Sequence, residues 1–290
     1  MPTRPAWFDP TLFPVESRWL DVDGHQVHYV DEGEGPVLLM LHGNPTWSFL
    51  YRRLIAGLSD RFRCVAPDLP GFGLSSARGG YGFTAAEHSA VVRRFVEALG
   101  LTDVTPVVQD WGGPIGLGAV VAEPERYRAL VVGNTWAWPS SASMRRFSAV
   151  MGGPWTGELV SQRLNLFVGQ LIPRVMRRRT LTAGERTMYR GPFPTVESRV
   201  PVRVFPRELV TAEPFLADLE SRLGVLAEKP ALLLWADKDI AFHAPERRRW
   251  QALLPDRRDH VLHGAGHYWQ DDAGEEAVLV IRDWWADRQP

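Results

Sequence analysis

An aspartate at the point where an apolar run gives way to two glycines is the residue best placed in this sequence to do covalent chemistry. Residues 104–113 read V-T-P-V-V-Q-D-W-G-G, a buried-strand pattern that leads into a helix, with Asp110 at the turn. A strand-to-helix turn of this kind exposes one side chain at the top of a sheet, and small neighbours let strand and helix approach closely. The pattern predicts Asp110 as a nucleophile, and the simpler alternative is a helix N-cap.

A carboxylate nucleophile favours saturated carbon as its target. Attack on an ester or amide carbonyl would give a mixed anhydride, which is a poor acyl-transfer intermediate. Displacement of halide from saturated carbon, or opening of an epoxide, instead gives an ordinary alkyl ester that an activated water can hydrolyse. Two N–H donors suit a departing halide: the Asn44 side chain, in H-G-N-P-T-W at residues 42–47, and the Trp111 indole. Asn44 considered alone is an ordinary turn residue.

A histidine and a second carboxylate follow later apolar runs, in the chain order nucleophile, acid, histidine. His267 lies in G-A-G-H-Y at residues 264–268, and its glycine neighbours leave the ring access to a site, as a general base requires. Asp237 and Asp239 both follow the run at residues 231–235. Asp239 is preferred as the acid, because this residue usually lies several positions beyond the strand end and before a hydrophobic residue. Four other histidines are interpreted as surface or turn residues: His25, His28, His243 and His260.

The elements that must position these residues alternate along most of the chain. Strands at residues 17–22 and 25–31 are joined by Asp23-Gly24, which favours a tight hairpin. A helix is predicted over residues 85–99, because Thr84 and Glu87 can cap it reciprocally. Together they indicate an α/β fold with a mostly parallel doubly wound sheet, whose site lies at the carboxyl ends of its strands. Short apolar runs typical of strands buried on both faces lie at residues 37–41, 62–66, 104–108, 129–132, 231–235 and 259–262.

The alternation stops after residue 132 and resumes only at residue 231, which indicates an insertion. This stretch has helical patterns, for example at residues 157–171, and a basic run at residues 177–179 that is interpreted as a solvated helix face. Because loops of this length are usually functional or disordered, we expect a helical cap packed over the site. The predicted division is a core domain at residues 1–135 and 221–290 and a cap domain at residues 136–220.

The composition is that of an ordinary soluble globular protein, with 45% hydrophobic and 23% charged residues among 290. Because 33 basic residues nearly cancel 34 acidic ones, no long-range field would draw the chain to nucleic acid or to a membrane, and a small, weakly charged partner fits better. The single cysteine, Cys64, excludes an internal disulfide, and the N-terminus lacks the apolar stretch of a signal peptide. We expect a cytoplasmic monomer or homodimer.

Twelve tryptophans are many for this length, and indole offers a large apolar face with one N–H donor. Two tryptophans and one phenylalanine of the predicted cap are candidates to line an apolar pocket or to pack the cap against the core: Trp138, Trp155 and Phe167.

Four of these motifs together carry a resemblance to a known family. H-G-N-P-T-W at residues 42–47 and Q-D-W-G-G at 109–113 resemble the halide-asparagine loop and the nucleophile turn of the haloalkane dehalogenases, in the α/β-hydrolase superfamily. A-P-D-L-P-G-F-G-L-S-S at 66–76 and G-A-G-H at 264–267 are shared more widely by the superfamily. The resemblance covers nearly the whole chain and implies the α/β-hydrolase fold with an inserted helical cap.

The resemblance also implies a reaction. Asp110 would displace halide from a small apolar halogenated substrate while Asn44 and Trp111 hold the halide, and His267, supported by Asp239, would activate water against the ester. The products would be a primary alcohol, halide and a proton, with no metal and no organic cofactor. Some relatives carry the acid as a glutamate after the sixth strand, where this chain reads G-N-T-W and offers no carboxylate.

Three alternatives remain. Epoxide hydrolases share the aspartate nucleophile but open the ring with a pair of cap tyrosines, and the predicted cap contains only Tyr189. A haloacid dehalogenase would usually place an arginine after the nucleophile, where Trp111 stands. The fold can also serve as a noncatalytic ligand receptor, since a fold alone does not settle function, but intact Asp110, His267 and Asp239 argue against that reading.

Overall fold

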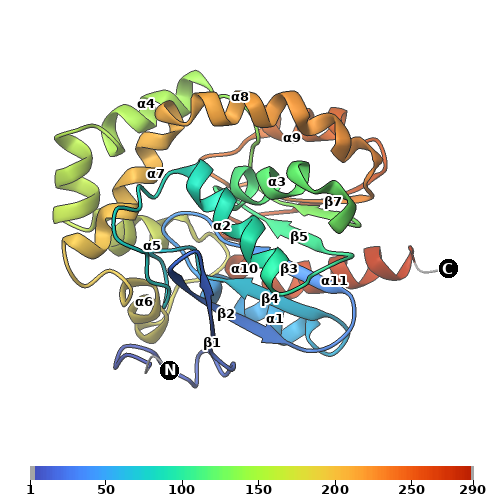
Figure 1. The fold of residues 1–290 in the computed structure, drawn as a ribbon, viewed down its shortest axis with the longest axis horizontal. Coiled ribbons are helices and arrows are strands. Elements are labelled where there is room, and N and C mark those ends of the chain that lie inside the picture. The colour runs from blue at the N-terminus through green and yellow to red at the C-terminus, as the bar shows by residue number, and fades with distance from the viewer. Residues whose placement is uncertain (1–3, 289–290) are drawn as a thin grey trace.

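An eight-stranded sheet organises the molecule, of which the computed structural model describes residues 4–288 (Figure 1). Its strand order is β1-β2-β4-β3-β5-β6-β7-β8. β2 pairs antiparallel with β1 and β4, whereas all the other neighbouring strands of the sheet pair in parallel. The strands are β1 (Arg18–Val22), β2 (His25–Glu32), β3 (Val37–Leu41), β4 (Arg63–Pro67), β5 (Thr105–Val108), β6 (Leu130–Val132), β7 (Ala231–Ala236) and β8 (Arg257–Leu262).

The predicted strands and the mostly parallel order are confirmed. Asp23 and Gly24 turn the β1–β2 hairpin with positive φ angles of 52° and 84°. β3, β5 and β7 are buried almost throughout, as continuous apolar runs predict for inner parallel strands. β8 starts at Arg257, earlier than predicted, because at the sheet edge its half-buried positions accept charged residues; Arg257 pairs there with Asp259 at 3.2 Å.

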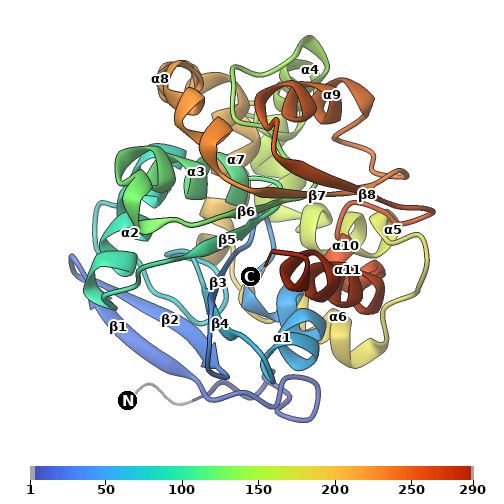
Figure 2. The same ribbon diagram turned by 90° about the vertical axis from the view of Figure 1, so that its right-hand side faces the viewer.

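Helices cover both faces of the sheet. Figure 2 shows α2 and α3 on one side and α1 and α11 on the other, and the members of each pair pack together. The predicted cap of α2 is present, with Glu87 N–H donating to Thr84 Oγ1 at 3.3 Å and Thr84 N–H to Glu87 Oε2 at 3.0 Å. The helices of the core are α1 (Arg52–Leu58), α2 (Ala85–Ala98), α3 (Gly112–Ala122), α9 (Ala244–Leu253), α10 (Trp269–Asp272) and α11 (Gly274–Ala286).

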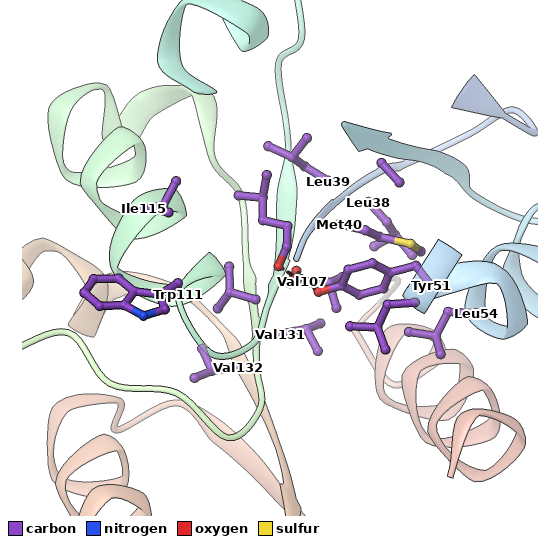
Figure 3. Packing of buried hydrophobic residues seen from close by; sticks show 14 of the residues in the cluster. Leu38, Leu39, Met40, Tyr51, Leu54, Val107, Trp111, Ile115, Val131 and Val132 are labelled. Carbon is purple, nitrogen blue, oxygen red and sulfur yellow. Dashed lines mark hydrogen bonds between the residues drawn. The ribbon is translucent and has the colours of Figure 1, made fainter. Parts of the chain in front are cut away.

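A buried tyrosine joins the two central strands near the ends that carry the site. The Tyr51 hydroxyl lies 2.8 Å from the carbonyl oxygen of Leu41 in β3 and 3.2 Å from that of Val107 in β5. Figure 3 shows Tyr51 on one side of these strands and Trp111 and Ile115 on the other. A buried tyrosine usually finds a partner for its hydroxyl, and here that partner is the backbone of the sheet.

The segment between β6 and β7 is mainly helical, as predicted, and we call its helices and the stretches between them the cap. The limits at residues 136 and 220 stay a prediction. The helical pattern expected over residues 157–171 is confirmed, but it is interrupted: two short π-helical segments form there, η3 (Glu158–Arg163) and η4 (Phe167–Leu171). Asn165 between them has a φ of 50°, which no right-handed helix continues through. The cap helices are α4 (Ala142–Met151), α5 (Ile172–Val175), α6 (Ala183–Arg190), α7 (Val200–Thr211) and α8 (Glu213–Arg222).

The interpretation of two histidines as surface residues is wrong. His25 and His28 are both buried, because β2 is an inner strand covered by the loop that follows β4. His28 Nδ1 lies 2.7 Å from Asp68 Oδ2, and Asp68 Oδ1 accepts the backbone N–H of Ser48 at 2.7 Å. These contacts fasten the loop that starts at Asp68 to β2. Cys64 is a buried free thiol, as expected.

Within residues 4–288, no helix combines the length and the apolar character needed to cross a lipid bilayer.

Candidate active site

The backbone at Asp110 is held in a conformation that few non-glycine residues adopt. Its φ is 49°, in the left-handed region, directly between the end of β5 and the start of α3. The loop after β6 clamps it from both directions: Asp110 N–H donates to the Asn134 carbonyl at 3.0 Å, and Thr135 Oγ1 donates to the Asp110 carbonyl at 2.6 Å. A Cβ on Gly113 would lie 1.8 Å from Thr135 Oγ1, so only glycine lets this loop reach the turn.

The Asp110 carboxylate has one oxygen bound and one free. Oδ2 accepts the backbone N–H of Asn44 at 2.9 Å, and a Cβ on Gly43 would lie 2.3 Å from the same oxygen. Burial raises the pKa of Asp110 above its usual value, while the charge of His267 and the backbone N–H groups of Trp111 and Asn44 oppose that rise. A carboxylate with so little hydration is a stronger nucleophile than one in water.

His267 lies between Asp110 and the preferred acid. Its Nδ1–H donates to Asp239, 3.0 Å from Oδ2 and 3.1 Å from Oδ1, and the backbone N–H of Ala241 donates to Asp239 Oδ1 at 2.7 Å. The structure brings Asp239 to His267 and places Asp237 elsewhere, where it accepts the N–H of Gly264 at 2.7 Å. Burial by itself would lower the pKa of His267, but Asp239 and Asp110 outweigh burial and hold it above the usual value.

The gap between base and nucleophile distinguishes this site from a serine triad. His267 Nε2 is 3.8 Å from Asp110 Oδ1, which is beyond hydrogen-bond length. A serine must pass its proton directly to the histidine, whereas a carboxylate has no proton to pass. The geometry suits a base that acts on a third molecule.

Gln109 is a site residue that the sequence interpretation missed. Its Nε2 donates to the His267 carbonyl at 3.1 Å and lies 3.2 Å from His267 Nε2. Because the carbonyl can only accept, the amide N–H side faces the ring, and Nε2 of the neutral imidazole is the acceptor there. This contact and Asp239 therefore select the same tautomer, with the proton on Nδ1. The sequence signal that could have identified Gln109 is its position directly before Asp110 in the same motif.

A mainly apolar cavity of about 200 Å³ is lined in part by Asp110. Asn44 and Trp111, the two predicted halide donors, both line it with Asp110 and His267. The Trp111 ring is held by Trp136, with ring centroids 4.7 Å apart. The Asn44 side-chain Nδ2 is 3.4 Å from the carbonyl of Val202 in α7, a long contact that leaves the amide available to another acceptor.

The predicted pocket residues of the cap separate into three situations. Phe167 lines the cavity, together with Met144 and Phe147 of α4. Trp138 instead packs against Trp250, with ring centroids 5.1 Å apart, and Trp155 is 84% exposed. Phe167 is therefore the only one of the three predicted residues in contact with the cavity.

Neither the cap tyrosine of the epoxide hydrolase alternative nor the basic run of the cap lines the cavity. The Tyr189 hydroxyl donates to Asp271 at 2.8 Å, outside the cavity, so its proton is engaged in a buried ion cluster. The basic run at residues 177–179 is not a solvated helix face. Arg178 pairs with Glu276, and Arg179 pairs with Asp271 and Glu185, which fastens the cap to the core. Among residues 4–288, no three His, Cys, Asp or Glu side chains are grouped to hold a metal ion.

One carboxylate joins the cap to the loop of the histidine. Asp272 Oδ2 accepts the backbone N–H of Gly266, next to His267, at 2.7 Å and that of Arg177 at 2.9 Å. Asp272 Oδ1 accepts the backbone N–H groups of Arg178 at 2.8 Å and Arg179 at 3.1 Å. The position of the cap segment and that of the loop that carries His267 therefore depend on the same side chain.

Comparison with known proteins identifies a family and relatives of this chain. The profile of the alpha/beta hydrolase fold family matches residues 36–273. Haloalkane dehalogenase 2 of Mycobacterium tuberculosis is 43% identical over 276 residues, which cover 94% of this chain and 96% of the relative. A cis-3-alkyl-4-alkyloxetan-2-one decarboxylase of Xanthomonas campestris is 33% identical over 281 residues, 91% of this chain and 93% of the relative.

A solved structure agrees with these sequence relatives. The haloalkane dehalogenase DbeA of Bradyrhizobium elkani superposes with a TM-score of 0.86 at 26% identity, over 94% of this chain and 98% of its own. The match extends over nearly all of both chains, so the sheet and the cap both have counterparts there.

Proposed function

Because this chain belongs to the haloalkane dehalogenases of the α/β-hydrolase superfamily, we propose that it hydrolyses carbon–halogen bonds through a covalent ester on Asp110. The observation that carries the proposal is the position of His267. Its Nδ1 lies 3.0 Å from Asp239 Oδ2, within hydrogen-bond length, whereas its Nε2 lies 3.8 Å from Asp110 Oδ1, beyond hydrogen-bond length. A histidine placed in this way supports hydrolysis of an ester on Asp110 and is not needed to form that ester.

In the first step, Asp110 Oδ1 attacks the carbon that bears the halogen. A bond forms between Oδ1 and carbon, and the carbon–halogen bond breaks with its electron pair leaving on the halide. The indole N–H of Trp111 and the side-chain amide of Asn44 receive the halide, since both line the cavity beside Asp110. Oδ2 keeps the hydrogen bond that it accepts from the backbone N–H of Asn44, and it becomes the carbonyl oxygen of the ester.

In the second step, His267 Nε2 takes a proton from a water molecule, whose oxygen attacks the ester carbon of Asp110. The charge that develops on Oδ2 is stabilised by the backbone N–H of Asn44, 2.9 Å away. The bond between the ester carbon and the alkyl oxygen then breaks, and the alkoxide takes the proton from His267 and leaves as alcohol. The second proton of the water is released, and Asp110 is again a carboxylate.

Ester formation itself prepares the base. The negative charge of Asp110 is one of the causes that raise the pKa of His267, and this charge disappears in the ester. The pKa of His267 is therefore lower in the intermediate than in the free enzyme, and the neutral imidazole that accepts a proton is favoured when it is needed. The Gln109 N–H at 3.2 Å from Nε2 acts in the same direction, because it faces the lone pair of the neutral ring.

The Xanthomonas relative supports a second candidate substrate. Its name gives a cis-3-alkyl-4-alkyloxetan-2-one as the compound on which it acts, and 33% identity over 91% of this chain makes that compound class a fair test. The cavity of about 200 Å³ is smaller than pockets that hold drug-sized ligands, which favours a short haloalkane over a lactone with two alkyl chains.

The deciding experiment is a burst assay with 1-bromobutane that compares the wild type with His267→Phe and Asp110→Ala. The wild type should release bromide continuously, and His267→Phe should release one equivalent and retain a butyl group on the peptide that contains Asp110, detected by mass spectrometry. Asp110→Ala should release none. Continuous turnover by His267→Phe would remove His267 from the mechanism.

A matched control uses a histidine outside the cavity. His263 has a side chain 81% exposed and contacts Asp237, so His263→Phe should turn over like the wild type. If the wild type releases no bromide from any bromoalkane but consumes an oxetan-2-one, the decarboxylase alternative replaces the dehalogenase proposal.

A further inference from the structure

Large apolar side chains gather on the outer surface of the cap between α4 and η4. Single exposed hydrophobic residues are normal, but a group within one short segment marks an interaction surface. The most exposed member is Trp155, at 84%. We call this group the cap apolar patch, and its members are Phe147, Val150, Trp155, Leu159, Leu164 and Leu166, each 40% or more exposed.

Local geometry brings these side chains together. Phe147 and Val150 are three residues apart on α4 and therefore lie on one flank of the helix. The N–H of Leu159 donates to the carbonyl of Trp155 at 3.1 Å, and that of Leu164 donates to Leu159 at 2.9 Å, so these residues follow one another on successive turns. In Figure 1 this stretch, in yellow-green next to α4, forms an outer corner of the molecule away from the two ends of the chain.

The cap segment that carries the patch has an excess of basic residues, although the whole chain carries a net charge of −1. Within residues 140–176 the one acidic residue is Glu158, and it pairs with Arg163 at 2.7 Å. The exposed residues Arg145, Arg146 and Arg174 have no acidic neighbour within this stretch. The balance of the total charge therefore hides a local excess of arginine beside the apolar side chains.

The exposed apolar side chains and the nearby arginines distinguish between two partners, a second copy of this protein and an anionic lipid surface. In a symmetric dimer the same patch would face itself, which would bring like-charged arginines together. An anionic lipid surface receives apolar side chains among its acyl chains and arginines at its head groups. We propose that the cap apolar patch docks this protein on an anionic lipid surface, a partner that the total charge did not predict.

The patch reaches the active-site cavity through one of its members. Phe147 lines the cavity and is also 40% exposed, and Ile240, at 47% exposed, lines it as well. Docking would therefore turn the cavity mouth toward the bilayer, where apolar haloalkanes concentrate. This part of the inference rests on the proposed function, whereas docking itself does not.

Vesicle flotation tests the docking without any turnover. The wild type should float with vesicles of phosphatidylcholine and phosphatidylglycerol at low salt, and should float much less with phosphatidylcholine alone or at high salt. The double variant Trp155→Ser/Leu159→Ser and the double variant Arg145→Gln/Arg146→Gln should each lose most of the flotation. A melting curve for each variant confirms that it is folded.

The matched control is Leu279→Ser, which removes a side chain 63% exposed on α11, outside the cap, and should float like the wild type. Absence of flotation at low salt, or equal loss in Leu279→Ser and the patch variants, overturns the proposal. So does self-association of the wild type in solution that Trp155→Ser/Leu159→Ser abolishes, since the patch would then cover a second copy. A protein that floats but releases no bromide would refute the proposed function and keep the docking.

Discussion

Asp110 in the core and Asn165 in the cap share almost the same unusual backbone, with φ angles of 49° and 50°. At Asp110 the loop after β6 clamps both the N–H and the carbonyl. At Asn165 the neighbours are two π-helical segments, and the buried side-chain Oδ1 has no partner among the described residues. At Asp110 the clamped backbone holds a reactive side chain in one position, whereas at Asn165 the same backbone conformation separates two helical segments.

The difference extends to individual glycines of the two regions. In the core, added atoms would collide with the turn, as the Cβ positions at Gly43 and Gly113 show. In the cap, a Cβ on Gly169 would meet nothing within 4 Å, and large apolar side chains point outward. Added atoms at Gly113 should therefore affect chemistry and stability together, and an added Cβ at Gly169 should affect neither.

The largest expected effect tests which acid the core uses. Asp239→Asn should lower kcat by about a thousandfold or more, because the buried partner of His267 Nδ1 loses its charge. Asp237→Asn, on a carboxylate that contacts Gly264 and His263, should change kcat by less than about threefold. Steady-state bromide release measures both, and a larger loss in Asp237→Asn would transfer the acid role to Asp237.

The next effect compares one substitution in the two regions. Gly113→Ala should lower the free energy of unfolding by about 3 kcal/mol and reduce bromide release, because its Cβ displaces Thr135 from the Asp110 carbonyl. Gly169→Ala should be neutral or stabilising by up to about 1 kcal/mol, since alanine favours a helical backbone and nothing blocks it. Urea unfolding measures both, and equal effects would contradict the contrast.

A smaller effect concerns the contact between core and cap. Burial alone would raise the pKa of Glu185, but Arg179, the Thr182 N–H and Arg52 lower it to about 2. Glu185→Gln should cost about 2 kcal/mol at neutral pH, since it removes hydrogen bonds to charged groups. Because the pKa is depressed on folding, this stabilisation is complete above about pH 4.5 and is lost as the pH falls toward about 2.

Melting curves of the wild type and Glu185→Gln at a series of pH values measure that loss. The difference in Tm should be widest at neutral pH and should narrow as the solution is acidified. Glu275→Gln, which changes a side chain 91% exposed, supplies the control and should show no difference at any pH. A constant gap down to low pH would show that Glu185 is not the titrating group.

The smallest effect belongs to the second strained residue. Asn165→Gly should change the free energy of unfolding by less than about 1 kcal/mol, because glycine adopts a positive φ without a Cβ penalty. Bromide release should be unaltered, in contrast to Asp110→Ala. A substantial loss of activity in Asn165→Gly would mean that the cap break also positions the cavity.

The predictable part of the molecule depends on local signals. Each inner strand appears as a continuous apolar run, and Asp110, Asp239 and His267 each follow such a run, so the sheet order that places them together follows from topology rules. The α2 cap was equally local, because Thr84 and Glu87 lie three residues apart and bond to each other. The roles of these site residues stay a proposal until the variants are measured.

The unpredicted part depends on partners that are distant in the sequence. Burial of His28 follows from Asp68, forty residues away, and the contact of Gln109 with His267 spans two strands. The π-helical cap segments arise where Asn165 interrupts a pattern that periodicity alone extends. The net charge of the chain gives no sign of the arginines beside the cap apolar patch, because acidic residues elsewhere in the sequence cancel them.

Asp272 bears on how this chain could have exchanged parts during evolution. A helical insertion is commonly regarded as a module that can be traded between related scaffolds to alter substrate range. Here three successive backbone N–H groups of the insertion share one carboxylate with Gly266, next to His267. A hybrid with a foreign insertion would keep these contacts beside His267 only if the new segment presented the same three donors, so residues 177–179 belong with the core as a unit of inheritance.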